Sequence, residues 1–148
     1  MFRVFVLAAT VAFGSAAGAE TLPGISYVVQ ASGPATGGRP TRADGVTMRY
    51  VGRLTDGSVF STSPEGGRGV SSFGVRDVIP GMSAALQLMR PGDRWRIRMP
   101  PYLAYGPGRP YTAPAGAAVQ AVQTRDIPAN ATLVFDVELV SIVPPAAK

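Results

Sequence analysis

The sequence contains no cysteine and no histidine, and these two absences exclude several kinds of site. Without them the chain lacks the ligands of the common zinc and copper centres, and it has no Ser-His or Cys-His pair for nucleophilic catalysis. Disulfide bonds are excluded as well, so packing alone must stabilise the folded chain. We therefore expect no metal and no cofactor, and any catalysis must rely on shape and dipoles.

A concentrated basic patch is also missing. The sequence has 14 basic and 9 acidic residues and a formal net charge of +5, but the arginines are scattered along it. Only Arg94, Arg96 and Arg98 lie close together, and they alternate with Trp95 and Ile97, which is typical of the solvated face of a strand. A nucleic-acid binder usually combines clustered charge with stacking aromatic residues. We therefore expect no nucleic acid among the partners.

Long apolar runs are absent except near the beginning of the chain. Residues 4–13 are mostly apolar, follow the basic Arg3 and precede the small-residue motif Ala-Gly-Ala that ends at Ala19. This order is typical of a secretory signal peptide, and the run is too short to span a bilayer of about 30 Å. We therefore expect cleavage after Ala19, removal of residues 1–19, no stable membrane insertion, and a periplasmic or secreted mature protein.

Alternating polar and apolar residues predict several strands in the remaining chain. Residues 20–45 form a lead-in rich in Gly, Pro and Thr, with one expected strand at residues 25–31 ("ISYVVQA"). From Val46 the alternation becomes regular, first in "VTMRYVGRL" and later in "RWRIRMP". The clearest strand is "ATLVFDVELV", residues 131–140, which has one apolar and one polar face.

A single segment, "PGMSAALQLM" at residues 80–89, has a helical pattern. Met82, Ala85, Leu86 and Met89 form one apolar stripe, and the Pro-Gly pair that follows should end the helix. Strands and helix together predict an α+β fold in which an antiparallel sheet wraps over one short helix. Residues 107–126, rich in Pro, Gly and Ala, predict an irregular loop before the last strand.

Four sequence blocks resemble one known family in both order and spacing. The blocks are "VTMRYVGRLTDGSVFSTS", "VIPGM", "MRPGDRWRIRMPPYLAYG" and "IPANATLVFDVELV", and the family is that of the FKBP-type peptidyl-prolyl cis/trans isomerases, exported bacterial type. The resemblance implies a domain at residues 46–148 whose loop at 107–126 is enlarged. It also implies a curved antiparallel sheet of five to six strands around one short α-helix, with an aromatic pocket between them.

The same resemblance implies a set of site residues. It assigns catalysis to Tyr105, Tyr50, Phe135 and Ser61, and substrate binding to Phe60, Val78, Ile79, Met82 and Ile127. Tyr105 is implied as the donor to the rotating carbonyl, and the backbone N–H of Ile79 as the clamp on the peptide. Rotation of an X-Pro bond crosses a barrier of roughly 20 kcal/mol without making or breaking a bond. An apolar pocket with a correctly positioned hydrogen-bond donor is therefore sufficient to catalyse this rotation.

Two residues depart from the family pattern. Ser61 stands where the family has an aspartate, and Met82 stands where it has a tryptophan at the pocket floor. A hydroxyl supplies no fixed charge, and a flexible thioether holds a proline ring less rigidly than an indole does. We therefore expect weak isomerase activity and reduced affinity for macrolide inhibitors.

Two other functions stay open at the level of sequence. One is a non-catalytic peptide-binding or chaperone module of the same fold. The other is an interaction domain of an envelope assembly that uses residues 107–125 as its contact surface. The expected partners of the isomerase are proline-containing unfolded or exported polypeptides. Some exported relatives dimerise through a long N-terminal helical arm, and since no such arm is evident here we expect a monomer.

Overall fold

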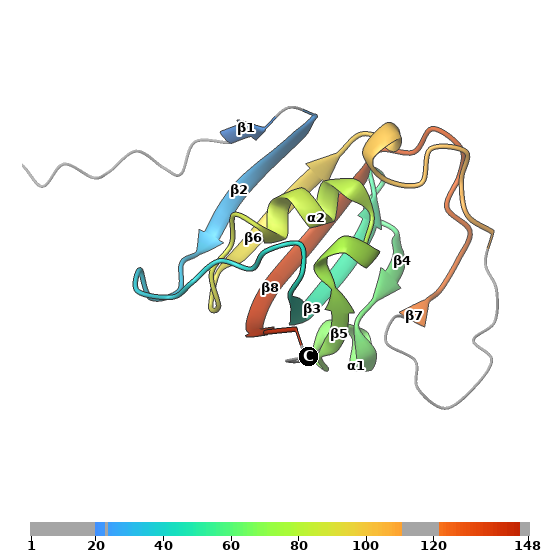
Figure 1. Ribbon diagram of the computed structural model, residues 1–148. Helices are drawn as coiled ribbons and strands as arrows, with labels where there is room; N and C mark the ends of the chain where they lie inside the picture. The colour runs from blue at the N-terminus through green and yellow to red at the C-terminus, as the bar shows by residue number, and fades with distance from the viewer. Residues whose placement is uncertain (1–19, 23, 111–121, 146–148) are drawn as a thin grey trace, which may run out of the picture.

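The computed structural model describes residues 20–22, 24–110 and 122–145 (Figure 1). Its strands are β1 (Glu20–Leu22), β2 (Ile25–Ala31), β3 (Gly45–Leu54), β4 (Val59–Thr62), β5 (Ser71–Gly74), β6 (Arg94–Met99), β7 (Val122–Gln123) and β8 (Leu133–Val143). Its helices are α1 (Pro64–Gly67), α2 (Pro80–Leu86), and the 3-10 turns η1 (Val75–Asp77) and η2 (Pro101–Leu103). The signal peptide predicted at residues 1–19 lies outside the described residues.

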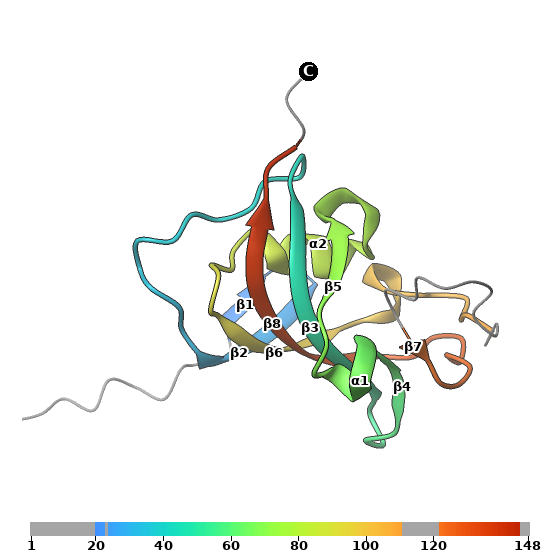
Figure 2. The ribbon, with the colours of Figure 1, turned by 90° about the horizontal axis from the view of Figure 1, so that it is seen from below.

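All of these strands belong to one antiparallel sheet. The order is β1-β2-β6-β8-β3-β4-β7, and β5 pairs with β3 beside this path. The sheet curves around α2, which lies against one of its faces (Figures 1 and 2). Strands β1 and β7 are very short, with three and two residues. The remaining strands, β2 to β6 and β8, agree with the five to six strands predicted from the sequence. The predicted α+β fold class is therefore confirmed.

The lead-in at residues 20–45 differs from the prediction, because it contains two strands rather than one. β1 and β2 form a hairpin in which Leu22 pairs with Ile25, and Gly24 takes the positive φ of +92° that the tight turn needs. β2 then pairs with β6 along its length, so the lead-in is part of the sheet.

The helix is shorter than predicted. It was expected over residues 80–89 and ends at Leu86. After it, the N–H groups of Leu88 and Met89 donate to carbonyls three residues back, which is the tightened geometry of a 3-10 turn. Pro91 follows and disfavours helical backbone in the residue before it. Met89 is nevertheless fully buried. The predicted apolar stripe is therefore confirmed, and the predicted end of the helix is wrong.

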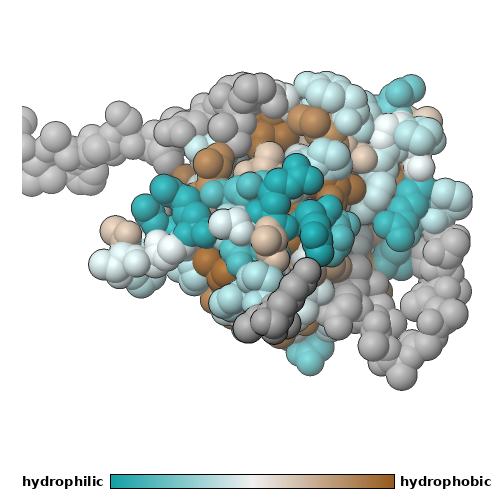
Figure 3. All heavy atoms as spheres, in the orientation of Figure 1, coloured by the Kyte–Doolittle hydropathy of each residue, from teal (hydrophilic) through white to brown (hydrophobic). Residues whose placement is uncertain are grey.

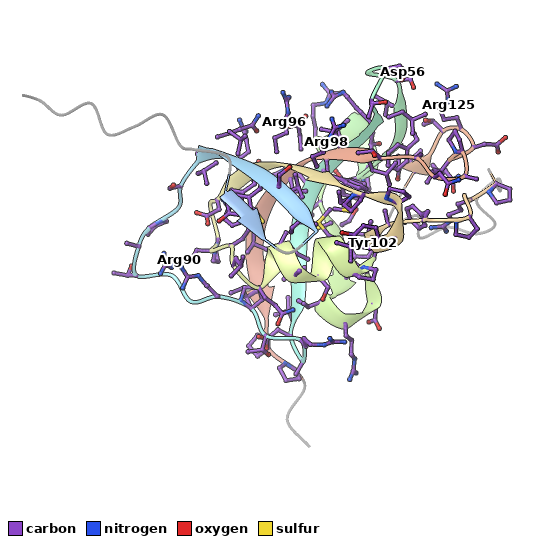
Figure 4. All side chains as sticks on the ribbon, turned by 90° about the horizontal axis from the view of Figure 1, so that it is seen from above. Asp56, Arg90, Arg96, Arg98, Tyr102 and Arg125 are labelled. Carbon is purple, nitrogen blue, oxygen red and sulfur yellow. The ribbon has the colours of Figure 1, made fainter. Side chains whose placement is uncertain are left out.

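The core lies between α2 and the inner face of the sheet. Strand β6 shows how alternation builds it, because Trp95, Ile97 and Met99 are buried while the arginines between them are exposed. Arg96 and Arg98 lie on the side of the sheet away from α2 (Figure 4). The solvated strand face predicted from the sequence is therefore confirmed. The helix contributes Met82, Ala85 and Leu86 to the core.

Ion pairs join the outer faces of the three neighbouring strands β3, β8 and β6. Asp136 on β8 lies between two arginines, with Arg96 Nε 2.8 Å from Oδ1 and Arg53 NH1 2.6 Å from Oδ2. Burial opposes ionisation of Asp136, but the hydrogen bonds and charges of Arg96 and then Arg53 outweigh it and hold its pKa below the usual value. Glu138 is bracketed in the same way by arginines of β3 and β6.

The surface on the α2 side is mainly hydrophilic, with smaller hydrophobic patches between the polar residues (Figure 3). Among residues 20–22, 24–110 and 122–145, no helix combines the length and hydrophobicity needed to cross a bilayer.

Candidate functional site

A cavity of about 320 Å³ opens between α2, the inner face of the sheet and the segments on either side of β7. Its wall consists of Met48, Tyr50, Phe60, Ser61, Phe73, Asp77, Val78, Ile79, Met82, Tyr105, Arg109, Gln123, Ile127 and Phe135. Every site residue expected from the sequence is in this set. The structure adds Met48, Phe73, Asp77, Arg109 and Gln123.

Aromatic rings form one side of the cavity. Phe60 on β4 and Phe135 on β8 meet edge to face, with ring centroids 5.5 Å apart and planes at 88°. Tyr50 on β3 lies 6.2 Å from the Phe135 ring and 6.3 Å from the Phe73 ring. These separations are typical of favourable aromatic pairs, so the rings fix one another in place. The result is an apolar wall of mutually packed aromatic rings.

A glycine behind the two phenylalanines makes this wall possible. Gly52 lies on β3, and a Cβ at this position would be 2.7 Å from Cζ of Phe60 and 2.9 Å from Cε1 of Phe135. Real side chains essentially never approach so closely, so the rings can pack against the strand only because no side chain is there.

The opposite side of the cavity is built by the beginning of α2. Pro80 occupies the first turn of the helix, where its fixed φ suits the helix and its missing N–H costs nothing. Ile79 is the N-cap residue, and among the described residues its N–H has no hydrogen-bond acceptor. Met82 follows one turn later, 2% exposed, and closes the floor. The free N–H of Ile79 is thus available to a bound peptide.

Two hydroxyl groups form a neutral polar contact on the sheet side. Oη of Tyr50 and Oγ of Ser61 lie 3.1 Å apart, and either one can be the donor. Burial raises the pKa of the Tyr50 hydroxyl, and the hydrogen bond to Ser61 offsets this only in part. The Tyr50 phenol therefore stays protonated at neutral pH.

The second tyrosine of the site is paired with an arginine. NH1 of Arg109 donates to the hydroxyl of Tyr105 at 3.3 Å, and the guanidinium carbon lies 5.4 Å from the centroid of the same ring. A phenol that accepts a hydrogen bond keeps its own proton for another partner. Tyr105 can therefore donate to a group inside the cavity while its hydroxyl oxygen accepts from Arg109.

The two legs of the predicted loop are attached to the cavity rim. Arg109 and Ile127 exchange backbone hydrogen bonds of 2.9 and 2.8 Å, which joins the outgoing leg to the returning one. On the returning leg, β7 pairs with β4 so that Gln123 lies opposite Ser61. The segment at 107–126, predicted to be irregular, thus contains a short strand, while residues 111–121 lie outside the described part.

A glutamine side chain reinforces this junction. Nε2 of Gln123 donates to the backbone carbonyls of Arg109 at 3.4 Å, Pro110 at 3.3 Å and Arg125 at 2.9 Å. One amide group thereby ties together both legs of the loop beside the cavity.

Only some of the added residues could have been found from the sequence pattern. Met48 and Tyr50 lie two positions apart on β3, so the alternation that buries one also buries the other. Arg109 lies on an irregular segment and Gln123 on the two-residue strand β7, so neither carries a local pattern. Only the pairing of the two loop legs brings them to the cavity.

A curved antiparallel sheet around one short helix, with an aromatic cavity between them, defines the class of FKBP-like domains. The sequence agrees with this class, because residues 37–140 match the FKBP-type peptidyl-prolyl cis-trans isomerase family. The chain belongs to this family.

Relatives of known description support the assignment. The chain is 40% identical over 128 residues to the FKBP-type peptidyl-prolyl cis-trans isomerase FkpA of Aeromonas hydrophila, which covers 86% of this chain and 41% of the relative. It is 38% identical over 126 residues to the outer membrane protein MIP of Legionella longbeachae, which covers 84% of this chain and 47% of the relative. The chain thus spans less than half the length of these two relatives.

Solved structures agree with the fold. The crystal structure of FkpA from Escherichia coli superimposes with a TM-score of 0.68 at 34% identity, covering 86% of this chain and 52% of that one. A peptidyl-prolyl cis-trans isomerase from Pseudomonas syringae pv. tomato superimposes with a TM-score of 0.62 at 32% identity, covering 86% of each chain.

Proposed function

We propose that this chain catalyses the cis/trans isomerisation of X-Pro bonds in polypeptides. The observation that carries the proposal is the position of Tyr105, a residue with a hydroxyl donor that lines a cavity formed mainly by apolar and aromatic side chains. Two of the relatives described above, those from Aeromonas hydrophila and Pseudomonas syringae, bear the name of this activity. A proline ring also matches the apolar wall in shape and chemistry.

The mechanism follows from the loss of amide resonance in the twisted state. Apolar surroundings favour this state, because twisting reduces the charge separation of the planar amide. The proline ring packs between Phe60, Phe135 and the Met82 floor, which holds one side of the bond. Tyr105 donates to the carbonyl that rotates, and the N–H of Ile79 holds the following peptide. No nucleophile or metal takes part.

A peptide assay tests this proposal directly. The folded protein should accelerate cis-to-trans conversion in a short X-Pro peptide, and a macrolide that binds FKBP domains should inhibit it. We expect a lower rate and weaker macrolide binding than in relatives with a carboxylate and an indole, because of Ser61 and Met82. A folded protein that binds the peptide without accelerating conversion would instead be a peptide-binding module.

We also propose that the protein is exported and monomeric. The basic start, apolar run and Ala19 site support export with cleavage after Ala19. The intact mass of protein from the native cell should correspond to a chain that begins at Glu20, and a retained residue 1 would contradict this. Light scattering on the purified protein should give the mass of one chain.

A further inference from the structure

The cavity wall contains two charged side chains, and they differ in how they are placed. Asp77 belongs to η1, and its carboxylate packs against Gly74 at the start of its own turn. Arg109 reaches the wall from the loop side and lies over the ring of Tyr105. The charge next to the Tyr105 hydroxyl is therefore positive.

Arg109 is held in place by its backbone. It is bridged to Ile127 in both directions, and the Gln123 amide binds its carbonyl. A residue fixed by three backbone contacts presents its side chain at a defined place on the rim, so less conformational entropy is lost when that side chain binds a ligand.

The guanidinium retains unused binding capacity. It has five N–H donors, and among the described residues its hydrogen-bond partner is the Tyr105 hydroxyl. Within the same part of the chain, no carboxylate lies within ion-pair distance of it. The nearby position at which the family has an aspartate is the neutral Ser61, so the wall offers no compensating charge on that side.

We propose that Arg109 makes this site select peptides with an acidic residue immediately before the proline. This inference rests on the proposed isomerase function. The carbonyl that rotates belongs to the residue before the proline, and in that function it meets Tyr105. The side chain of the same residue therefore lies close to the guanidinium over the Tyr105 ring. A carboxylate there can accept hydrogen bonds from the guanidinium, whose planar donors fit it well.

The test compares peptides that differ only in the residue before proline. Glu and Gln form the decisive pair, since they have the same size and differ in charge, and Lys is the opposite case. We expect kcat/KM for the Glu peptide to exceed that for the Gln peptide by roughly three- to fivefold at low salt, as for an exposed ion pair. At about 1 M salt the difference should shrink, because screening there acts over about 3 Å.

Variants assign the effect to one residue. Arg109→Gln should abolish the difference between the Glu and Gln peptides, and Arg109→Glu should shift the preference to the Lys peptide. Arg76→Gln is the matched control, because Arg76 is an exposed arginine on η1 outside the cavity wall. It removes the same charge from the protein and should leave the preference intact.

The possible failures are distinguishable. Equal acceleration of the Glu and Gln peptides would overturn the selectivity and leave the isomerase function standing. A preference that persists in Arg109→Gln would also overturn the role of this residue. Absence of acceleration for every peptide would overturn the isomerase function and the selectivity with it.

Discussion

The hydroxyl oxygens of Tyr50 and Ser61 lie 3.1 Å apart across the paired strands β3 and β4. This contact is neutral, because both partners are alcohols and the Tyr50 phenol keeps its proton. A carboxylate at position 61 would instead accept a charge-assisted hydrogen bond from Tyr50, which is roughly twice as strong.

The first prediction is that Ser61→Asp raises kcat/KM on X-Pro peptides. A fixed carboxylate would orient the Tyr50 hydroxyl and make the cavity wall more rigid. A tenfold gain corresponds to about 1.4 kcal/mol of transition-state stabilisation, which one such bond can supply. The gain should be larger together with Met82→Trp, since an indole floor holds the proline ring more firmly.

Ser61→Asn is the control for this prediction, because it adds a side chain of the same shape without the charge. It should leave kcat/KM near that of the natural protein. If Ser61→Asp is well folded and no more active than Ser61→Asn, the orienting role of a carboxylate at this position is wrong.

Tyr105→Phe should lower kcat/KM by roughly tenfold, the value of one neutral hydrogen bond to the rotating carbonyl. The unfolding temperature should change little, because Tyr105 is only partly buried. Tyr102→Phe removes a hydroxyl from a ring that is 72% exposed and serves as the control. Full activity of Tyr105→Phe on all peptides would show that the donor is another group.

Gly52→Ala should destabilise the fold by about 1 to 3 kcal/mol, because the added methyl group displaces the rings of Phe60 and Phe135. Gly38→Ala is the matched control, since a Cβ there meets no atom within 4 Å. Urea unfolding of both variants measures the difference. Equal stability of the two variants would mean that the rings of Phe60 and Phe135 can move aside without a loss of folding free energy.

Asp136→Asn should weaken the pH dependence of stability in acid. The folded-state pKa of Asp136 lies below its ordinary value of 3.8, so the carboxylate contributes stability above that pH and loses it as the pH falls further. In the variant the free energy of unfolding should be lower at neutral pH and should decline less steeply through this range. Denaturant titrations at several pH values measure the slope.

Glu65→Gln removes one acidic charge from an exposed site outside the ion pairs of β8 and is the control for Asp136→Asn. Its free energy of unfolding should fall with decreasing pH in the same way as that of the natural protein. The same acid dependence of the free energy of unfolding in the natural protein and both variants would show that the arginines do not hold Asp136 ionised.

The fold was predictable where a segment was long enough to show its period. Strands β2, β6 and β8 each have at least six residues and were predicted from alternation or composition alone. β1 and β7 have three and two residues, which is too short for an alternating pattern to be recognised. Both are strands only because they form backbone hydrogen bonds with a neighbouring strand. The end of α2 was missed because the apolar stripe continues to Met89 in a 3-10 turn.

The site was predictable where family positions could be matched to this sequence. Those residues all line one cavity, and their roles in catalysis stay predictions. Arg109 and Gln123 were not found, because they are brought to the rim by backbone pairing between segments with no recognisable pattern. A cation next to Tyr105 is a property of the folded chain that neither composition nor spacing expresses.

The place of β8 in the sheet has a consequence for the order in which the protein can form. β8 lies between β6 and β3, and the described structure contains no direct pairing between those two strands. Until residues 133–143 have left the ribosome, the described strands can associate only as two separate groups, each with an unpaired edge. The nascent chain therefore exposes unpaired strand edges until nearly all of β8 has been released. We expect the sheet to form in a single late step.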